Sequence, residues 1–190
     1  LVNQFYAPDI SPTAQLAASL AEHRADLGDQ VTIVTGRAGY LEGLAPAGAL
    51  KTGPGLRIHR IWTPDLGKSS RLRRVLGYAT FSVGSALRML TLPRQDVVVA
   101  MTTPPLIVVA ALLHQLLHRS TRVVLWSMDC YPDAAERFGE VAPGGTVSRA
   151  LRAVNRWAFR RLDVVVGLDG AMVELLRSQY AAGPSRPRFA

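Results

Sequence analysis

Short runs of β-branched residues alternate with longer amphipathic segments along the chain, and this alternation predicts a parallel α/β fold. Strands are expected at VTIVT (31–35), LRIHRI (56–61), DVVVAM (96–101), RVVLW (122–126) and DVVVGL (163–168), and LVNQF (1–5) would be the end of a first strand. Helices are expected at about 13–27, 69–92, 105–118, 147–161 and 170–180. Strand–helix–strand repetition requires crossover connections, so we predict a doubly wound, Rossmann-like parallel sheet.

Polar segments follow the ends of four predicted strands. They are YAPDISPT (6–13), TTPP (102–105), SMDCYPD (127–133) and LDG (168–170). In the usual strand order 3-2-1-4-5-6, ligands bind beyond the carboxyl ends of the strands, where strands one and four meet. We therefore expect the four segments to share one edge of the sheet and to form a cleft there.

Two phosphate-binding motifs are absent. No glycine-rich G-x-G-x-x-G follows the first strand, and no G-x-x-x-x-G-K-[ST] occurs, so neither a nicotinamide enzyme nor a P-loop enzyme is expected. Ser11 and Thr13 instead stand at the start of a predicted helix, whose free N–H groups can hold an anion. Either residue can also be a simple helix cap, and the two roles are compatible.

Four segments resemble, in order and spacing, the amino-terminal, acceptor-side domain of family-four-like glycosyltransferases, especially those that build bacterial surface polysaccharides. They are NQFYAPDISPTAQLAASLAEHRADLGDQVTIVTG, VVVAMTTPPLIV, VVLWSMDCYPDAAERFG and DVVVGLDGAMVELL. The resemblance implies one half of a two-domain glycosyltransferase B fold, with this domain at 1–182 and a linker or disordered tail at 183–190. Ala7 stands where the family usually has another proline.

The resemblance implies retaining transfer of a sugar from a nucleotide-diphosphate donor to a glycan acceptor, often linked to a polyprenyl lipid, without a bound metal or cofactor. The family's second domain, with its paired glutamates and most donor contacts, is not in this chain, so the fragment alone is expected to be inactive. A non-catalytic binding or scaffold module of the same fold and a fragment of a sugar-nucleotide epimerase are the alternatives.

The same resemblance implies roles for individual residues. Ser11, Pro12 and Thr13 would form the loop near the donor phosphates. Thr102 and Thr103 would line the acceptor side, and Asp129 would position an acceptor hydroxyl. Tyr131 would stack on a sugar or form a wall of the cleft. Asp169 would reach the same edge or cap the last helix.

The basic residues are concentrated in two segments. Residues 66–94 and 146–162 hold 11 of the 22 Lys and Arg residues and no acid, within a net charge of +8. Periodicity places Leu72, Val75, Leu76, Ala79, Val83, Ala86, Leu87 and Leu90 on the core side of helix 69–92, and it places Val147, Leu151, Val154 and Ala158 inward on helix 147–161. Outward residues suited to an anionic membrane surface are Arg74, Phe81, Arg88, Arg149, Arg152, Arg156 and Arg160.

The sequence also bears on nucleic-acid binding, on cellular location and on membrane spans. No helix-turn-helix, zinc-ligand or RNP pattern supports nucleic acid as the partner of the arginines. The single cysteine, Cys130, and the absence of a secretory signal in residues 1–15 favour a cytoplasmic protein, peripheral on the inner face of the membrane. The apolar stretch 97–113 is broken by Pro104 and Pro105, so we expect a strand and a helix rather than a membrane span.

Three further patterns suggest chemistry and have structural alternatives. His114 and His118 have the i, i+4 spacing of metal ligands, but nothing nearby completes a set, so a structural role is favoured. Cys130 beside Asp129 suggests a nucleophile, without a histidine that the sequence pairs with it. Asp129 and Asp133 suggest paired carboxylates, but Pro132 between them marks a rigid turn.

Overall fold

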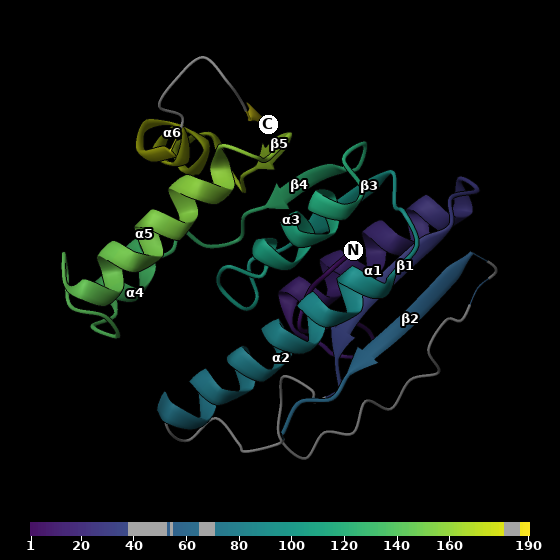
Figure 1. Ribbon diagram of the computed structural model, residues 1–190, viewed down its shortest axis with the longest axis horizontal. Coiled ribbons are helices and arrows are strands. Elements are labelled where there is room, and N and C mark those ends of the chain that lie inside the picture. Colours follow the sequence, from purple (N-terminus) through teal and green to yellow (C-terminus); the bar gives the residue numbers. More distant parts are fainter. Residues whose placement is uncertain (38–52, 54, 65–70, 181–186) are drawn as a thin grey trace. The chain divides into compact units, whose positions relative to one another are not determined.

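A computed structural model describes residues 1–37, 53, 55–64, 71–180 and 187–190, and the chain forms two compact units, Leu1–Pro93 and Arg94–Ala190. The starts of helix 69–92 and of the predicted tail lie outside the described residues, at 69–70 and 183–186. Each unit has its own parallel strands and its own helices (Figure 1).

The first unit is built on three parallel segments. Strand β1 (Val31–Gly36) pairs with β2 (Leu56–Ile61), and Val2 forms a parallel bridge to Val34 on the other side of β1. The N–H of Val34 donates to the carbonyl of Leu1 at 2.9 Å, and the N–H of Asn3 donates to the carbonyl of Val34 at 3.1 Å. The opening LVNQF is therefore a strand segment, as predicted, and the unit has the expected order 3-2-1.

Helix α1 (Pro12–Asp26) contacts both strands of this unit. It buries Ala14, Ala17 and Ala21, whose small side chains allow a close approach to the strands. Proline is favoured in the first turn, where its missing N–H costs no hydrogen bond. The helix ends before Gly28, which has φ +93°, and the N–H of Gly28 donates to the carbonyl of Ala25 at 2.9 Å. A glycine with positive φ just after a helix is a common way to end it.

Helix α2 (Arg71–Thr91) packs against the first unit through the face opposite to the one that we predicted to be buried. Phe81, Ser85 and Met89 are buried, whereas most of the predicted core residues are exposed. Leu72, Val75, Leu76, Val83, Leu87 and Leu90 have exposed fractions from 38% to 69%. The periodicity of the sequence identified the apolar stripe correctly, but it does not determine whether that stripe is buried or exposed. Phe81 packs beside Gly36 at the end of β1, which fixes the helix with this stripe outward.

The second unit has a four-stranded parallel sheet in the order β3-β4-β5-β6 (Figure 1). The strands are β3 (Val97–Ala100), β4 (Arg122–Trp126), β5 (Val164–Val166) and β6 (Arg188–Phe189). Val98 pairs with Val123, and Leu125 pairs with Val165, and all four side chains are buried. Strand β6, which was not predicted, pairs with β5 within the segment that we expected to be a linker or a disordered tail.

Four helices connect these strands. They are α3 (Val108–Leu117), α4 (Asp133–Arg137), α5 (Thr146–Phe159) and α6 (Gly170–Tyr180). Helix α3 begins three residues later than predicted, because the TTPPLI segment forms a turn in which Leu106 has φ +65°. The short helix α4 was not predicted. Among the described residues, no helix has the length and apolar character needed to span a bilayer.

The register of the second sheet brings three loops to one edge. Ala100 pairs with Leu125, and Trp126 pairs with Val166, so the loops that follow β3, β4 and β5 all leave from the carboxyl ends of neighbouring strands. The opposite edge is held by Asp163, whose carboxylate accepts the N–H of Val123 at 2.9 Å and the side-chain amide of Gln115 at 3.3 Å. Three of the four predicted loops therefore share an edge, and the fourth belongs to the first unit.

Replacing Gly77 and Gly84 by alanine in turn is expected to change stability in opposite directions. Both glycines lie inside α2, where alanine is favoured by about 0.5–1 kcal/mol. A methyl group at Gly77 meets no neighbouring atom within 4 Å, so Gly77→Ala should raise the Tm by about 2–4 °C.

At Gly84 the methyl group would collide with Cγ2 of Ile61, a stiff β-branched side chain on β2. Relieving such a contact costs about 1–3 kcal/mol, so Gly84→Ala should lower the Tm. Thermal unfolding followed by circular dichroism measures both variants. If Gly84→Ala were as stabilising as Gly77→Ala, α2 would not pack on β2 as described.

Candidate active site at the carboxyl edge of the second sheet

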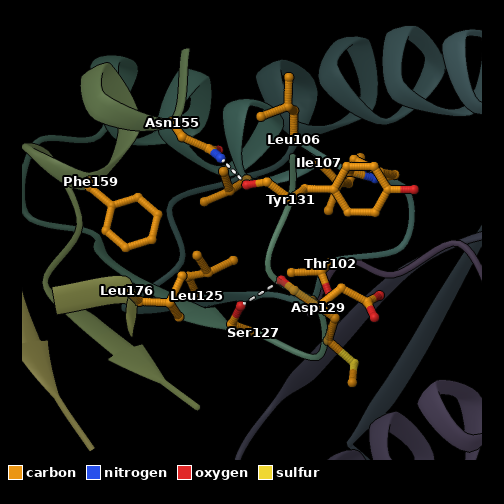
Figure 2. Close-up of a pocket in the computed structure, with 13 residues that line it drawn as sticks. Thr102, Leu106, Ile107, Leu125, Ser127, Asp129, Tyr131, Asn155, Phe159 and Leu176 are labelled. Atoms are coloured by element: carbon orange, nitrogen blue, oxygen red, sulfur yellow. Dashed lines mark hydrogen bonds between the residues drawn. The ribbon is translucent and has the colours of Figure 1, made fainter. Parts of the chain in front are cut away.

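A pocket lies where the loops after β3 and β4 meet helices α5 and α6 (Figure 2). It contains three of the predicted site residues, Thr102, Asp129 and Tyr131. The remaining lining residues are Met101, Pro105, Leu106, Ile107, Val108, Leu125, Ser127, Asn155, Phe159 and Leu176. All of them belong to the second unit. Residues of TTPP and of SMDCYPD therefore line one pocket of this unit, and the functional roles predicted for them stay predictions.

Three hydrogen bonds tie the loops of the pocket to one another. The N–H of Met128 donates to the Thr102 hydroxyl oxygen at 3.0 Å, which joins the loop after β4 to the loop after β3. The N–H of Ser127 donates to the Val166 carbonyl at 2.8 Å, and the Ser127 hydroxyl donates to the Asp129 carbonyl at 3.0 Å. The position of Asp129 is therefore set by contacts with both neighbouring strands.

The Asp129 carboxylate lies on the solvent-accessible rim of the pocket. Partial burial raises the pKa of this carboxyl above its ordinary value of 3.8, because the apolar surroundings disfavour the charged form. A carboxylate whose pKa is raised in this way is a stronger proton acceptor than a fully solvated one. A raised pKa in a pocket is typical of a functional carboxylate.

Tyr131 is held through its backbone by two residues that sequence reasoning missed. Its carbonyl accepts the Asn155 amide N–H at 2.7 Å and the Tyr180 hydroxyl at 3.5 Å. Asn155 and Tyr180 are buried, and the ring of Tyr180 contacts that of Phe159, with centroids 4.6 Å apart. The only hint of this support in the sequence was Asn155, a polar residue at an otherwise apolar position of α5.

The predicted site residues in the remaining loops have other surroundings. Thr103 is partly exposed and does not line the pocket. Asp169 accepts the N–H of Met172 at 2.7 Å and so caps α6, as the simpler alternative predicted. Burial raises the pKa of the Cys130 thiol, and the charges of Asp133, Asp129 and Asp169 raise it further. A thiol of raised pKa is a poor nucleophile at neutral pH.

The predicted donor-phosphate loop belongs to the first unit. Ser11 is the residue before α1, and its N–H donates to the Asp9 carboxylate at 2.8 Å, but its hydroxyl makes no capping hydrogen bond. Pro12 is the first residue of the helix, and Thr13 follows within its first turn. Arg60, which was not predicted, donates to the Ala7 carbonyl at 2.7 Å. The role of this loop in phosphate binding stays a prediction.

Three of the predicted membrane-contact residues have other roles. Phe81 is fully buried, so it cannot contact a membrane. The guanidinium of Arg88 lies 2.9 Å from Nδ1 of His59, whose pKa is lowered by burial and by the charges of Arg88 and Arg57, so the neutral ring can accept. Arg152 pairs with Asp133 at 2.8 Å and with Glu136 at 2.9 Å, which joins α4 to α5.

The other predicted membrane-contact residues differ in their exposure. Arg149, Arg156 and Arg160 are exposed on α5, and Arg74 is partly exposed on α2. The inward residues of α5 are only partly as predicted: Ala158 is buried, Leu151 and Val154 are half-buried, and Val147 is exposed. The helix is anchored instead by Ser148, which donates to Glu136, and by Asn155, Ala158 and Phe159.

The described residues hold no group of three or more His, Cys, Asp or Glu side chains that could bind a metal ion. His114 is buried, its Nε2 accepts the N–H of Gln95 at 3.3 Å, and its ring contacts that of His118. The structural role that we favoured for this histidine pair is confirmed.

Comparison with known proteins agrees with this fold. The family model of the glycosyl transferase 4-like domain matches residues 13–189, which include parts of both compact units. Comparison with curated proteins found no match. The α/β architecture with parallel strands is consistent with the Rossmann-like half of a glycosyltransferase B fold, as the sequence predicted.

Proposed function

The chain belongs to the glycosyl transferase 4-like family, and from this premise we propose that it is the acceptor-binding half of a retaining glycosyltransferase. The donor is a nucleotide-diphosphate sugar, and the acceptor is a glycan of surface-polysaccharide type, carried on a lipid. Most donor contacts come from a second domain of the same architecture. The observation that carries the proposal is the pocket at the carboxyl edge of the second sheet, with the Asp129 carboxylate at its rim.

Asp129 has the properties needed to orient an acceptor. Its carboxylate accepts a hydrogen bond from the attacking hydroxyl, and its raised pKa strengthens that bond. In the transfer, the bond from the anomeric carbon to the diphosphate oxygen breaks and a bond to the acceptor oxygen forms, while the Asp129 carboxylate accepts the hydroxyl proton. The N–H groups at the start of α1 are suited to the negative charge that develops on the diphosphate.

The apolar stripe of α2, defined by its six exposed residues Leu72, Val75, Leu76, Val83, Leu87 and Leu90, supports a membrane-bound acceptor. Helix α2 carries four arginines and no acidic residue, so its charge complements an anionic lipid surface. The helix lies along a bilayer rather than across it, with the stripe in contact with the acyl chains. This surface replaces the one predicted around Phe81.

Asp129→Asn in the transferase complete with its donor-binding domain is expected to reduce transfer to a glycan acceptor by about 10²-fold, the lower end of the usual acid–base effect. Hydrolysis of the nucleotide sugar by water should change little, because no acceptor hydroxyl has to be oriented. Asp96→Asn is the matched control, since Asp96 is exposed and pairs with Arg94 at the amino end of β3.

The pH dependence of the same transfer provides a second readout. The wild-type rate should fall as the pH drops through the pKa of Asp129, which lies above 3.8, because the protonated carboxyl no longer accepts a proton. Asp129→Asn should lack this fall. Full transfer by Asp129→Asn, with the same fall at low pH as in the wild type, would contradict the role proposed for Asp129.

The membrane proposal predicts binding of the chain to phosphatidylglycerol vesicles in a sedimentation assay. Replacing both Val83 and Leu87 by serine should weaken this binding about tenfold or more, because two exposed apolar side chains no longer enter the bilayer. Leu117→Ser, a change of the same kind at an exposed position on α3, should have no such effect. Equal binding by the wild type and the double variant would contradict the assignment of α2.

A further inference from the structure

We propose that the pocket beside Asp129 selects acceptor sugars that carry a methyl group, as an acetamido or a 6-deoxy substituent does. This inference rests on the proposed function, and it names the class of acceptor that the site takes. The acceptor hydroxyl would lie at the Asp129 rim, and the methyl group would enter the interior.

The interior of the pocket is apolar and small. Ile107, Leu125, Phe159 and Leu176 line it and are all buried, whereas Asp129 and Tyr131 on its other side reach solvent. Figure 2 shows Phe159 and Leu176 on the side away from the Asp129 carboxylate. The cavity has a volume of about 30 Å³, which is room for roughly two water-sized groups. A methyl or acetyl group fits this space, whereas a whole sugar ring does not.

Two hydrogen-bond donors next to the interior, on Ser127 and Asn155, already donate to backbone carbonyls. The Ser127 hydroxyl donates to the Asp129 carbonyl, and the Asn155 amide donates to the Tyr131 carbonyl (Figure 2). A hydroxymethyl group placed in the interior would need a new partner for its hydroxyl. A buried hydroxyl without a partner is unfavourable, so the pocket favours a methyl group over a hydroxymethyl group.

Leu106 is a second, independent indication that the pocket has a function. It has φ +65°, which is the left-handed region, and it is the only non-glycine residue in the described part of the chain with a positive φ. This conformation is unusual for leucine, and strained residues of this kind cluster at ligand sites. A glycine would adopt this conformation without strain, and the leucine side chain that is present here lines the pocket.

The test compares two pairs of free sugars by NMR titration of the ¹⁵N-labelled chain. One pair is N-acetylglucosamine and glucose, and the other is L-rhamnose and L-mannose. We expect the methyl-bearing sugar of at least one pair to bind about tenfold more tightly, the lower range for a methyl group in an apolar pocket. The pair that shows the preference identifies the substituent as acetamido or 6-deoxy.

Leu106→Gly should abolish the preference while leaving the chain folded, since glycine removes the strain together with the side chain. Leu168→Ala is the control, because Leu168 is an exposed leucine at the same edge and does not line the pocket. Equal affinities within both pairs, or a preference that survives in Leu106→Gly, would overturn the inference. If both sugars of each pair bind equally and still shift the backbone amide signal of Asp129, the proposed function stands and only the methyl preference is lost. If no sugar binds, the result counts against both the proposed function and the methyl preference.

Discussion

The parallel register of β3, β4 and β5 is the constraint on which the candidate site depends. A shift of one residue would exchange the two faces of a strand and would move the loop at its end. The register is held by buried valine and leucine pairs on one face, such as Val98 with Val123, and at the amino edge by the Asp163 carboxylate, which accepts the N–H of Val123. With the strands fixed in this way, the loops after β3 and β4 have to meet at the carboxyl edge.

Short polar contacts convert that edge into a defined pocket. Thr102 accepts a hydrogen bond from the backbone of the loop after β4, the backbone N–H of Ser127 donates to Val166, and Asn155 donates to the carbonyl of Tyr131. The site is therefore supported by contacts between segments. The site also has energetic costs. Burial disfavours the charged form of Asp129, and Leu106 adopts a left-handed conformation. Such costs are usual where a structure is organised for binding rather than for stability alone.

Much of the fold could be predicted because its signals are local. The valine-rich runs defined the strands within one or two residues at each end, and the polar segments after β3 and β4 led to Thr102, Asp129 and Tyr131. Features that depend on tertiary packing were missed. The stripe of α2 is exposed rather than buried, Arg152 pairs with acids of α4, and Arg188–Phe189 adds a strand. Neither periodicity nor composition determines which element packs against a given face of a helix. They also do not determine which backbone carbonyl accepts the hydrogen bond of Asn155.

The central claim is that the loops after β3 and β4 form one binding site for a glycan. Mapping of backbone amide shifts while a surface-polysaccharide oligosaccharide is added to the labelled chain tests it most directly. The account predicts that the shifts concentrate at residues 101–108 and 127–131, with smaller changes at Asn155. Shifts concentrated instead at the amino edge of the same sheet, around Gln95 and Thr121, would contradict it.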